Sequence, residues 1–255
     1  MTDTTDRATS QDRMRALLVP VATLGTIALN AFAAAGLVNA VKPDVISAKY
    51  PTVLTPAAYA FTIWWLIYVG LIAFSVYQAL PANLLRFRSV RSLYIFSCLL
   101  NCGWIYFWHR EQVGICLGLM LALLASLFLI LILFTRTSGG ELFTKATFGI
   151  YAGWVTVASI VNLAVFLNYE AFEVSDPAWS VLGAILIILS AALSVIVRWK
   201  LRNYVYALAV AWGLTAIAVK QGGHTAIVVS AAIAVVACLL TSGSIVVELK
   251  DSTSE

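Results

Sequence analysis

Long apolar stretches, separated by short polar segments, dominate the chain from residue 17 onward. A helix needs about 20 mostly apolar residues to cross the hydrocarbon core of a bilayer. Eight stretches approach or exceed that length, so the pattern predicts eight membrane-spanning helices. The predicted spans cover residues 17–39, 56–80, 92–108, 112–134, 145–168, 177–198, 203–219 and 224–246. The third and the seventh are the shortest, and a count of seven is the alternative.

The composition supports a membrane protein. Of 255 residues, 62% are hydrophobic and only 11% are charged, whereas about a quarter of the residues in a soluble domain are charged. So little charge cannot cover a globule of this size in water. The sequence therefore predicts an all-α integral membrane protein and excludes a soluble enzyme and a disulfide-stapled secreted domain. With a net charge of only +4, no nucleic-acid partner is expected.

The distribution of basic residues predicts the orientation, because cytoplasmic loops carry an excess of lysine and arginine. With eight spans, most of the 16 basic residues lie on the side that holds both termini. The other side keeps only Lys42, Lys49, Arg110 and Lys220. Both termini are therefore expected to be cytoplasmic. The protein is expected to be a multi-pass protein of the plasma membrane, or of the cell inner membrane if its source is bacterial.

Patterns typical of catalysis or of metal binding are missing from the sequence. It has no phosphate-binding loop, no Gly-x-Ser-x-Gly segment and no cluster of metal ligands. No ionisable side chain falls near the middle of a predicted span, which argues against an ion-coupled transporter. His109 is expected to be interfacial, with haem ligation as the less favoured alternative. We therefore expect no catalytic residue and no metal site, and we favour ligand binding or passage over catalysis.

Aromatic residues and asparagines recur at helical spacing on three predicted spans. They are Trp64 and Tyr68 in the second span, Asn101 and Trp104 in the third, and Tyr151, Trp154 and Asn162 in the fifth. Their spacings place each set on one helix face. An asparagine in hydrocarbon is costly unless it is hydrogen-bonded, so these faces should point at protein or at a cavity. The pattern predicts an aromatic pocket between mid-membrane and the outer leaflet, suited to a flat apolar ligand.

Two simpler interpretations stay open beside the pocket. Tryptophan and tyrosine gather in belts at membrane interfaces, and asparagine joins transmembrane helices by hydrogen bonds. Trp108, Trp179, Trp199 and Tyr204 stand at span ends and fit such a belt.

The same residues carry a resemblance to a known family, the TspO/MBR family (tryptophan-rich sensory protein / translocator protein, also called the peripheral benzodiazepine receptor family). The matching motifs are Thr55 and Pro56 followed by Trp-Trp-Leu-Ile-Tyr (64–68), Leu-Asn-Cys-Gly-Trp (100–104) followed by Phe107 and Trp108, and Tyr-Ala-Gly-Trp (151–154) followed by Asn162. All three occur in the family's order and on the corresponding spans. The resemblance covers about residues 17–168 and implies a five-helix bundle there.

The resemblance also implies a function. Members bind tetrapyrroles such as protoporphyrin IX or haem, or sterol-like lipids, in a pocket that the seven residues named above would line or support. No cofactor is required, and the connection over residues 40–55 would close over the pocket. Implied roles are sensory, regulatory or transport-facilitating. Light-driven porphyrin breakdown has been proposed for some members, so an enzymatic role stays open. Implied partners are membrane lipid, a small apolar or tetrapyrrole ligand and a second copy of the chain.

The predicted organisation is a polar, disordered tail (1–16), the five-helix bundle (17–168), an additional unit of three membrane helices (169–247) and a C-terminal tail (248–255). The additional unit leaves other functions open. The chain could instead be a permease for an apolar solute, or a membrane assembly partner that binds no small ligand.

Overall fold

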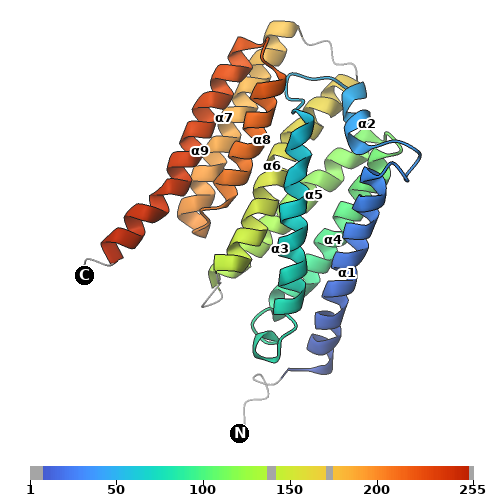
Figure 1. Ribbon diagram of the computed structural model, residues 1–255, viewed down its shortest axis with the longest axis vertical. Helices are drawn as coiled ribbons and strands as arrows, with labels where there is room; N and C mark the ends of the chain where they lie inside the picture. The colour runs from blue at the N-terminus through green and yellow to red at the C-terminus, as the bar shows by residue number, and fades with distance from the viewer. Residues whose placement is uncertain (1–7, 137–141, 171–174, 253–255) are drawn as a thin grey trace.

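A computed structural model shows helices and no strands over the residues that it describes, which are 8–136, 142–170 and 175–252. The long helices are α1 (Ser10–Ala34), α3 (Ile63–Tyr77), α4 (Arg88–Trp108), α5 (Val113–Arg136), α6 (Leu142–Tyr169), α7 (Asp176–Leu201), α8 (Tyr206–Lys220) and α9 (Thr225–Ser252). The short ones are α2 (Pro43–Lys49) and the 3₁₀ helices η2 (Ala58–Thr62) and η3 (Pro81–Asn83). The long helices alternate in direction, so that α1 begins and α9 ends at the same end of the molecule (Figure 1).

The prediction of an all-α membrane protein is confirmed. Within the described residues, seven helical segments are long and apolar enough to cross a membrane. Six of them are α1, α4, α5, α6, α7 and α9, and the seventh is η2 together with α3. The remaining predicted span, residues 203–219, forms α8, which has only 15 residues. The eighth helix therefore exists where the apolar pattern places it, but it is shorter than a typical span.

Packing explains how α8 can be short. Fifteen residues extend about 22 Å, less than the ~30 Å of hydrocarbon. Helix α8 packs against α6, α7 and α9, and hydrogen bonds within the protein hold its first residues. Asn203 accepts hydrogen bonds from the backbone N–H groups of Val205 and Tyr206, and its amide donates to the carbonyl oxygen of Lys145 on α6. The backbone groups at this end of α8 therefore find partners within the protein.

Helix α1 begins earlier than the apolar pattern indicates. Thr9 and Asp12 form a capping box, in which the Thr9 hydroxyl accepts from the Asp12 N–H and the Asp12 carboxylate accepts from the Thr9 N–H. Such a cap stabilises the first helical turn. As a result, residues 10–16 are helical although we expected them in the polar tail. At the other end of the chain, α9 runs to Ser252 and so includes part of the expected C-terminal tail. Residues 1–7 and 253–255 of the two tails lie outside the described part.

The predicted bundle and the additional helices are in direct contact. Helix α8 packs along α6, where the carbonyl oxygen of Tyr206 would lie 2.4 Å from a Cβ placed on Gly153. Beside it, the Tyr206 hydroxyl lies 2.6 Å from the hydroxyl of Thr156. Gly153 thus allows the two backbones to approach more closely than any larger residue would permit.

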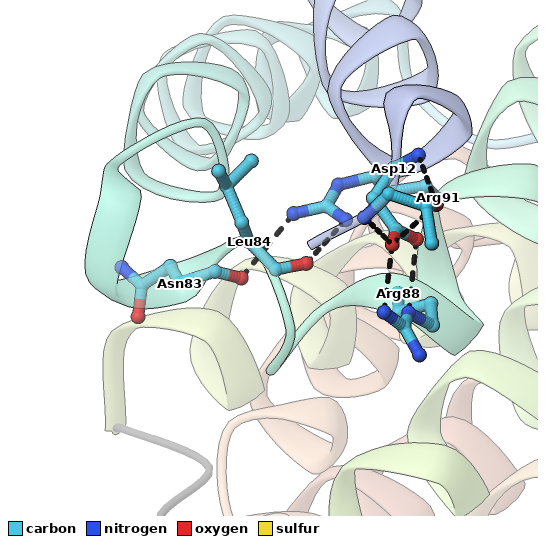
Figure 2. Close-up of polar contacts among 6 residues, drawn as sticks. Asp12, Asn83, Leu84, Arg88 and Arg91 are labelled. Carbon is cyan, nitrogen blue, oxygen red and sulfur yellow. Dashed lines mark hydrogen bonds and ion pairs between the residues drawn. The ribbon is translucent and has the colours of Figure 1, made fainter. Parts of the chain in front are cut away.

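At the end of the molecule that holds both termini, a buried arginine joins α4 to the connection that follows α3 (Figure 2). The Arg91 side chain is fully buried, and its guanidinium donates to the side-chain and backbone oxygens of Gln78 and to the carbonyl oxygens of Asn83 and Leu84. Arg88 makes a bidentate ion pair with Asp12 at 2.7 and 2.9 Å. The predicted third span begins at residue 92 and so leaves both arginines in the preceding loop, whereas α4 begins at Arg88 and includes them.

Candidate functional site

The seven residues predicted to form a pocket come from α3, α4 and α6, and ring contacts and hydrogen bonds between these helices bring them together. The Trp64 ring is at their centre. It stacks on Tyr68, with centroids 5.6 Å apart, and meets Tyr151 and Trp154 edge to face at 5.8 and 6.4 Å. Such offset and edge-to-face pairs are the favoured arrangements of aromatic rings. Aromatic faces from three helices therefore surround one region of the bundle.

Hydrogen bonds fix the polar members of this set. Asn30 on α1 donates to Asn101 Oδ1 over 2.7 Å, and Asn101 donates to the Tyr151 hydroxyl over 3.0 Å. Trp104 Nε1 donates to Asn162 Oδ1 over 3.1 Å. The asparagines therefore do link helices, as the simpler interpretation proposed, and at the same time they orient the aromatic rings. The two interpretations are compatible.

One polar atom in this region has no partner among the described residues. Trp154 is only 3% exposed, and its indole Nε1–H is buried without a hydrogen bond. An unmade hydrogen bond to a buried donor costs about 1–3 kcal/mol. Trp154 borders a small cavity, so a molecule that occupies this space and carries an acceptor could satisfy the indole N–H.

Two adjoining cavities are lined by the predicted residues. The smaller, of about 50 Å³, is bordered by Trp64, Trp104, Trp154 and Asn162. The larger, of about 340 Å³, is bordered by Trp64, Tyr68 and Trp104, together with residues of α1 that include Asn30. Both include Pro43 of α2 and Phe61 of η2 in their linings. Asn101 and Tyr151 line neither cavity and instead support the rings that do.

The segment between α1 and α3, residues 35–62, lies over these cavities, and we call it the lid. Its first half is joined to the connection between α4 and α5. Trp108 Nε1 donates to the carbonyl oxygen of Pro43 over 3.1 Å, and both ring nitrogens of His109 lie near backbone carbonyl oxygens, those of Val41 and Ile105. His109 therefore has a structural role in this region.

Glu111 completes this first attachment, pairing with Lys49 at the end of α2 and accepting from the Tyr50 hydroxyl over 2.6 Å. The Lys49 and Tyr50 hydrogen bonds hold the pKa of Glu111 below its ordinary value. Burial and the bond to Glu111 raise the pKa of Tyr50 to about 12. Each bond therefore favours a charged carboxylate and a neutral phenol, the forms present near neutral pH.

The second half of the lid is joined to α8. Gln221 Nε2 donates to the carbonyl oxygens of Thr52 and Thr55, each over 2.9 Å. The backbone N–H of Ala57 donates to the carbonyl oxygen of Ala216 over 2.9 Å, and Trp212 Nε1 donates to the carbonyl oxygen of Ala60 over 3.0 Å. The lid is therefore attached at one end to the bundle and at the other to the C-terminal helices.

Sequence reasoning missed several parts of this site. Pro43 and Ser47 of α2 line the small cavity, and Phe61 lines both cavities and meets Trp154 edge to face at 6.0 Å. No periodicity could identify them, because α2 has seven residues and η2 five, too few for a repeated pattern. The contribution of Gln221 was likewise invisible, since it depends on how α8 packs. The described residues contain no cluster of three metal-ligating side chains.

Fold and site together define a multi-pass helical membrane protein with an aromatic pocket beneath a structured lid. A family model described as TSPO-like protein matches residues 16–245, and the chain belongs to this family. The resemblance drawn from the three motifs is thereby confirmed, and the match extends beyond residue 168 through α7, α8 and most of α9. Neither a comparison with curated proteins nor one with solved structures gave a match. The family associates the chain with ligand binding or transport at a membrane.

Proposed function

We propose that this protein binds a flat, largely apolar ligand of the tetrapyrrole type in the aromatic pocket beneath the lid. The observation that carries the proposal is the unpartnered indole N–H of Trp154, buried among the rings of Phe61 and Trp64. Aromatic walls favour a planar apolar body, and one free donor favours a ligand with a hydrogen-bond acceptor.

The volumes of the cavities indicate that side chains must move before a ligand of this kind can bind. Sites for small molecules are commonly 300–1,000 Å³, and the larger cavity alone reaches about 340 Å³. The smaller one, at about 50 Å³, cannot hold such a ligand unless its walls shift. Trp64 and Phe61 line both spaces, so a ligand that displaces these rings would reach from one cavity into the other. Trp64 is half-buried, which leaves its ring freer to move than that of Trp154.

The proposal is tested by titrating the detergent-purified protein with protoporphyrin IX and following the porphyrin absorbance, which does not depend on the number of tryptophans. Wild-type protein is compared with Trp154→Phe and with a matched control, Trp199→Phe. Trp199 is 65% exposed and lies near the far end of α7. We expect saturable binding that Trp154→Phe weakens by about two- to tenfold, the value of one hydrogen bond, and that Trp199→Phe leaves unchanged.

Non-saturable uptake, or equal affinity in all three proteins, would contradict the proposal. A further experiment addresses the role that binding serves. Vesicles that contain the protein and a trapped porphyrin acceptor should gain internal porphyrin faster than empty vesicles if the protein facilitates transport. If binding is saturable but the flux equals that of empty vesicles, a sensory or regulatory role is favoured.

A further inference from the structure

A third hollow lies beside the aromatic pocket, between the lid and the C-terminal helices. Its volume is about 620 Å³, and it is bordered by lid residues, the end of α6, the start of α7 and the turn between α8 and α9. The apolar part of its lining includes Pro56, Phe61 and Trp179. All of these elements lie at the same end of the molecule as α2 (Figure 1).

Hydrogen bonds from two sides hold the wall of this hollow in place. Gln221 bonds to the carbonyl oxygens of Thr52 and Thr55, and Asn168 donates to the carbonyl oxygen of Pro51 over 3.2 Å. All five residues border the hollow. The space is therefore shaped by contacts between the lid and two other parts of the chain.

Charged and titratable side chains also border the hollow. They are Lys220 and His224 at the turn between α8 and α9, Asp44 on α2 and Asp176 at the start of α7. No ion pair joins any of them to another of the described residues. Both carboxylates stand in the first turn of their own helix, where a negative charge is stabilising. His224, in contrast, directly precedes α9, at a helix end that favours an anion.

The hollow shares part of its lining with the aromatic pocket, because Ser47, Pro56 and Phe61 border both. We propose that the hollow is a second part of the binding site, in which Lys220 and His224 receive the anionic group of an amphipathic ligand whose flat apolar body occupies the aromatic pocket. This inference rests on the proposed function and assigns a recognition role to the turn between α8 and α9.

Lys220 and Asp176 border the hollow with opposite charges, so the inference predicts opposite effects when each is neutralised. An anionic group near Lys220 gains attraction, and the same group is repelled by Asp176. Neutralising each residue should therefore change affinity in opposite directions. A ligand recognised through a cationic group would give the reverse pattern, and a ligand that does not reach the hollow would respond to neither change.

The experiment compares protoporphyrin IX, which has two carboxylates, with its uncharged dimethyl ester, using the full-length protein in a neutral detergent. Lys220→Gln should weaken binding of the diacid by about two- to fivefold, the size expected for one exposed ion pair. Asp176→Asn should strengthen it by a similar factor. Neither variant should change the affinity for the ester, which also shows that each variant retains a folded pocket. Lys200→Gln, at the far end of α7, is the matched control.

Equal responses of diacid and ester, or no response of the diacid to either variant, would overturn the inference and leave the proposed function intact. Weaker diacid binding in Asp176→Asn would also overturn it, because removing a negative charge beside a bound carboxylate should not weaken its binding. If neither compound binds to the wild-type protein, the proposed function itself fails.

Discussion

Replacing Trp154 or Trp104 by phenylalanine removes the same atoms from two rings that line one cavity, with opposite consequences for hydrogen bonding. The Trp154 indole N–H has no partner, whereas that of Trp104 donates to Asn162 Oδ1. Because the loss of ring volume is similar in the two variants, their difference in stability reports mainly on the hydrogen bond. Trp104→Phe is therefore expected to be less stable than Trp154→Phe.

The structure sets the size of this difference. Asn162 is 4% exposed, so loss of the Trp104 donor leaves a buried oxygen without that partner, which costs about 1–3 kcal/mol. Trp154→Phe removes an unsatisfied donor and relieves a cost of the same kind. Hydrogen bonds between membrane helices average about 0.6 kcal/mol in measured cases, which argues for the lower part of the range. We expect a difference of at least about 1 kcal/mol between the two variants.

The measurement is equilibrium unfolding of both variants and the wild type in mixed micelles with increasing sodium dodecyl sulfate, followed by far-ultraviolet circular dichroism. The ligand titration described above is then run on the same samples. Trp154→Phe should keep most of the stability and lose affinity. Equal destabilisation by both substitutions, or lower stability in Trp154→Phe, would refute the assignment of a free donor to Trp154.

Three further outcomes are expected. Gly153→Ala should lower the free energy of unfolding by about 1–3 kcal/mol, because its Cβ would lie 2.4 Å from a backbone oxygen of α8, as the same unfolding assay will show. Arg91→Leu should cost about 2–5 kcal/mol in that assay, because it leaves four oxygens, three of them in buried hydrogen bonds, without their donor. Protonation of Glu111 would weaken its bonds to Lys49 and Tyr50. Hydrogen exchange of the lid amides should therefore rise as the pH falls below 4.5, the ordinary pKa of this carboxyl group, toward its lower pKa in the folded protein.

Matched controls separate these effects from general ones. Gly118→Ala has open space around the added Cβ, so it should change stability by less than about 1 kcal/mol. Glu111→Gln cannot lose a charge, so its lid should exchange at a rate independent of pH in the acid range after correction for intrinsic exchange. A cost for Gly118→Ala equal to that for Gly153→Ala, or an unchanged acid dependence in Glu111→Gln, would contradict the corresponding prediction.

Hydrophobic periodicity predicted the long helices, in which many residues at regular spacing share the same environment. The apolar stretches located every long helix, and the shared faces brought Trp64, Trp104 and Trp154 into one region. The boundaries were less accurate where a local bond decides them, as with the capping box that starts α1 at Ser10. The resemblance implied a cover over residues 40–55, but its contacts could not be predicted from the pattern, since they depend on single residues such as Gln221 whose partners lie more than 160 positions away.

The two attachments of the lid affect what a fragment of the chain can be expected to do. Because the lid bonds to α8 and the residue after it through Trp212, Ala216 and Gln221, the ligand binding proposed above would be thermodynamically linked to the docking of α7–α9 on the bundle. A ligand that favours the closed lid must, by reciprocity, tighten the association of the C-terminal helices to the same extent. A fragment that ends before α7 would thus lack one attachment of the lid, and its affinity would describe a different equilibrium from that of the whole chain.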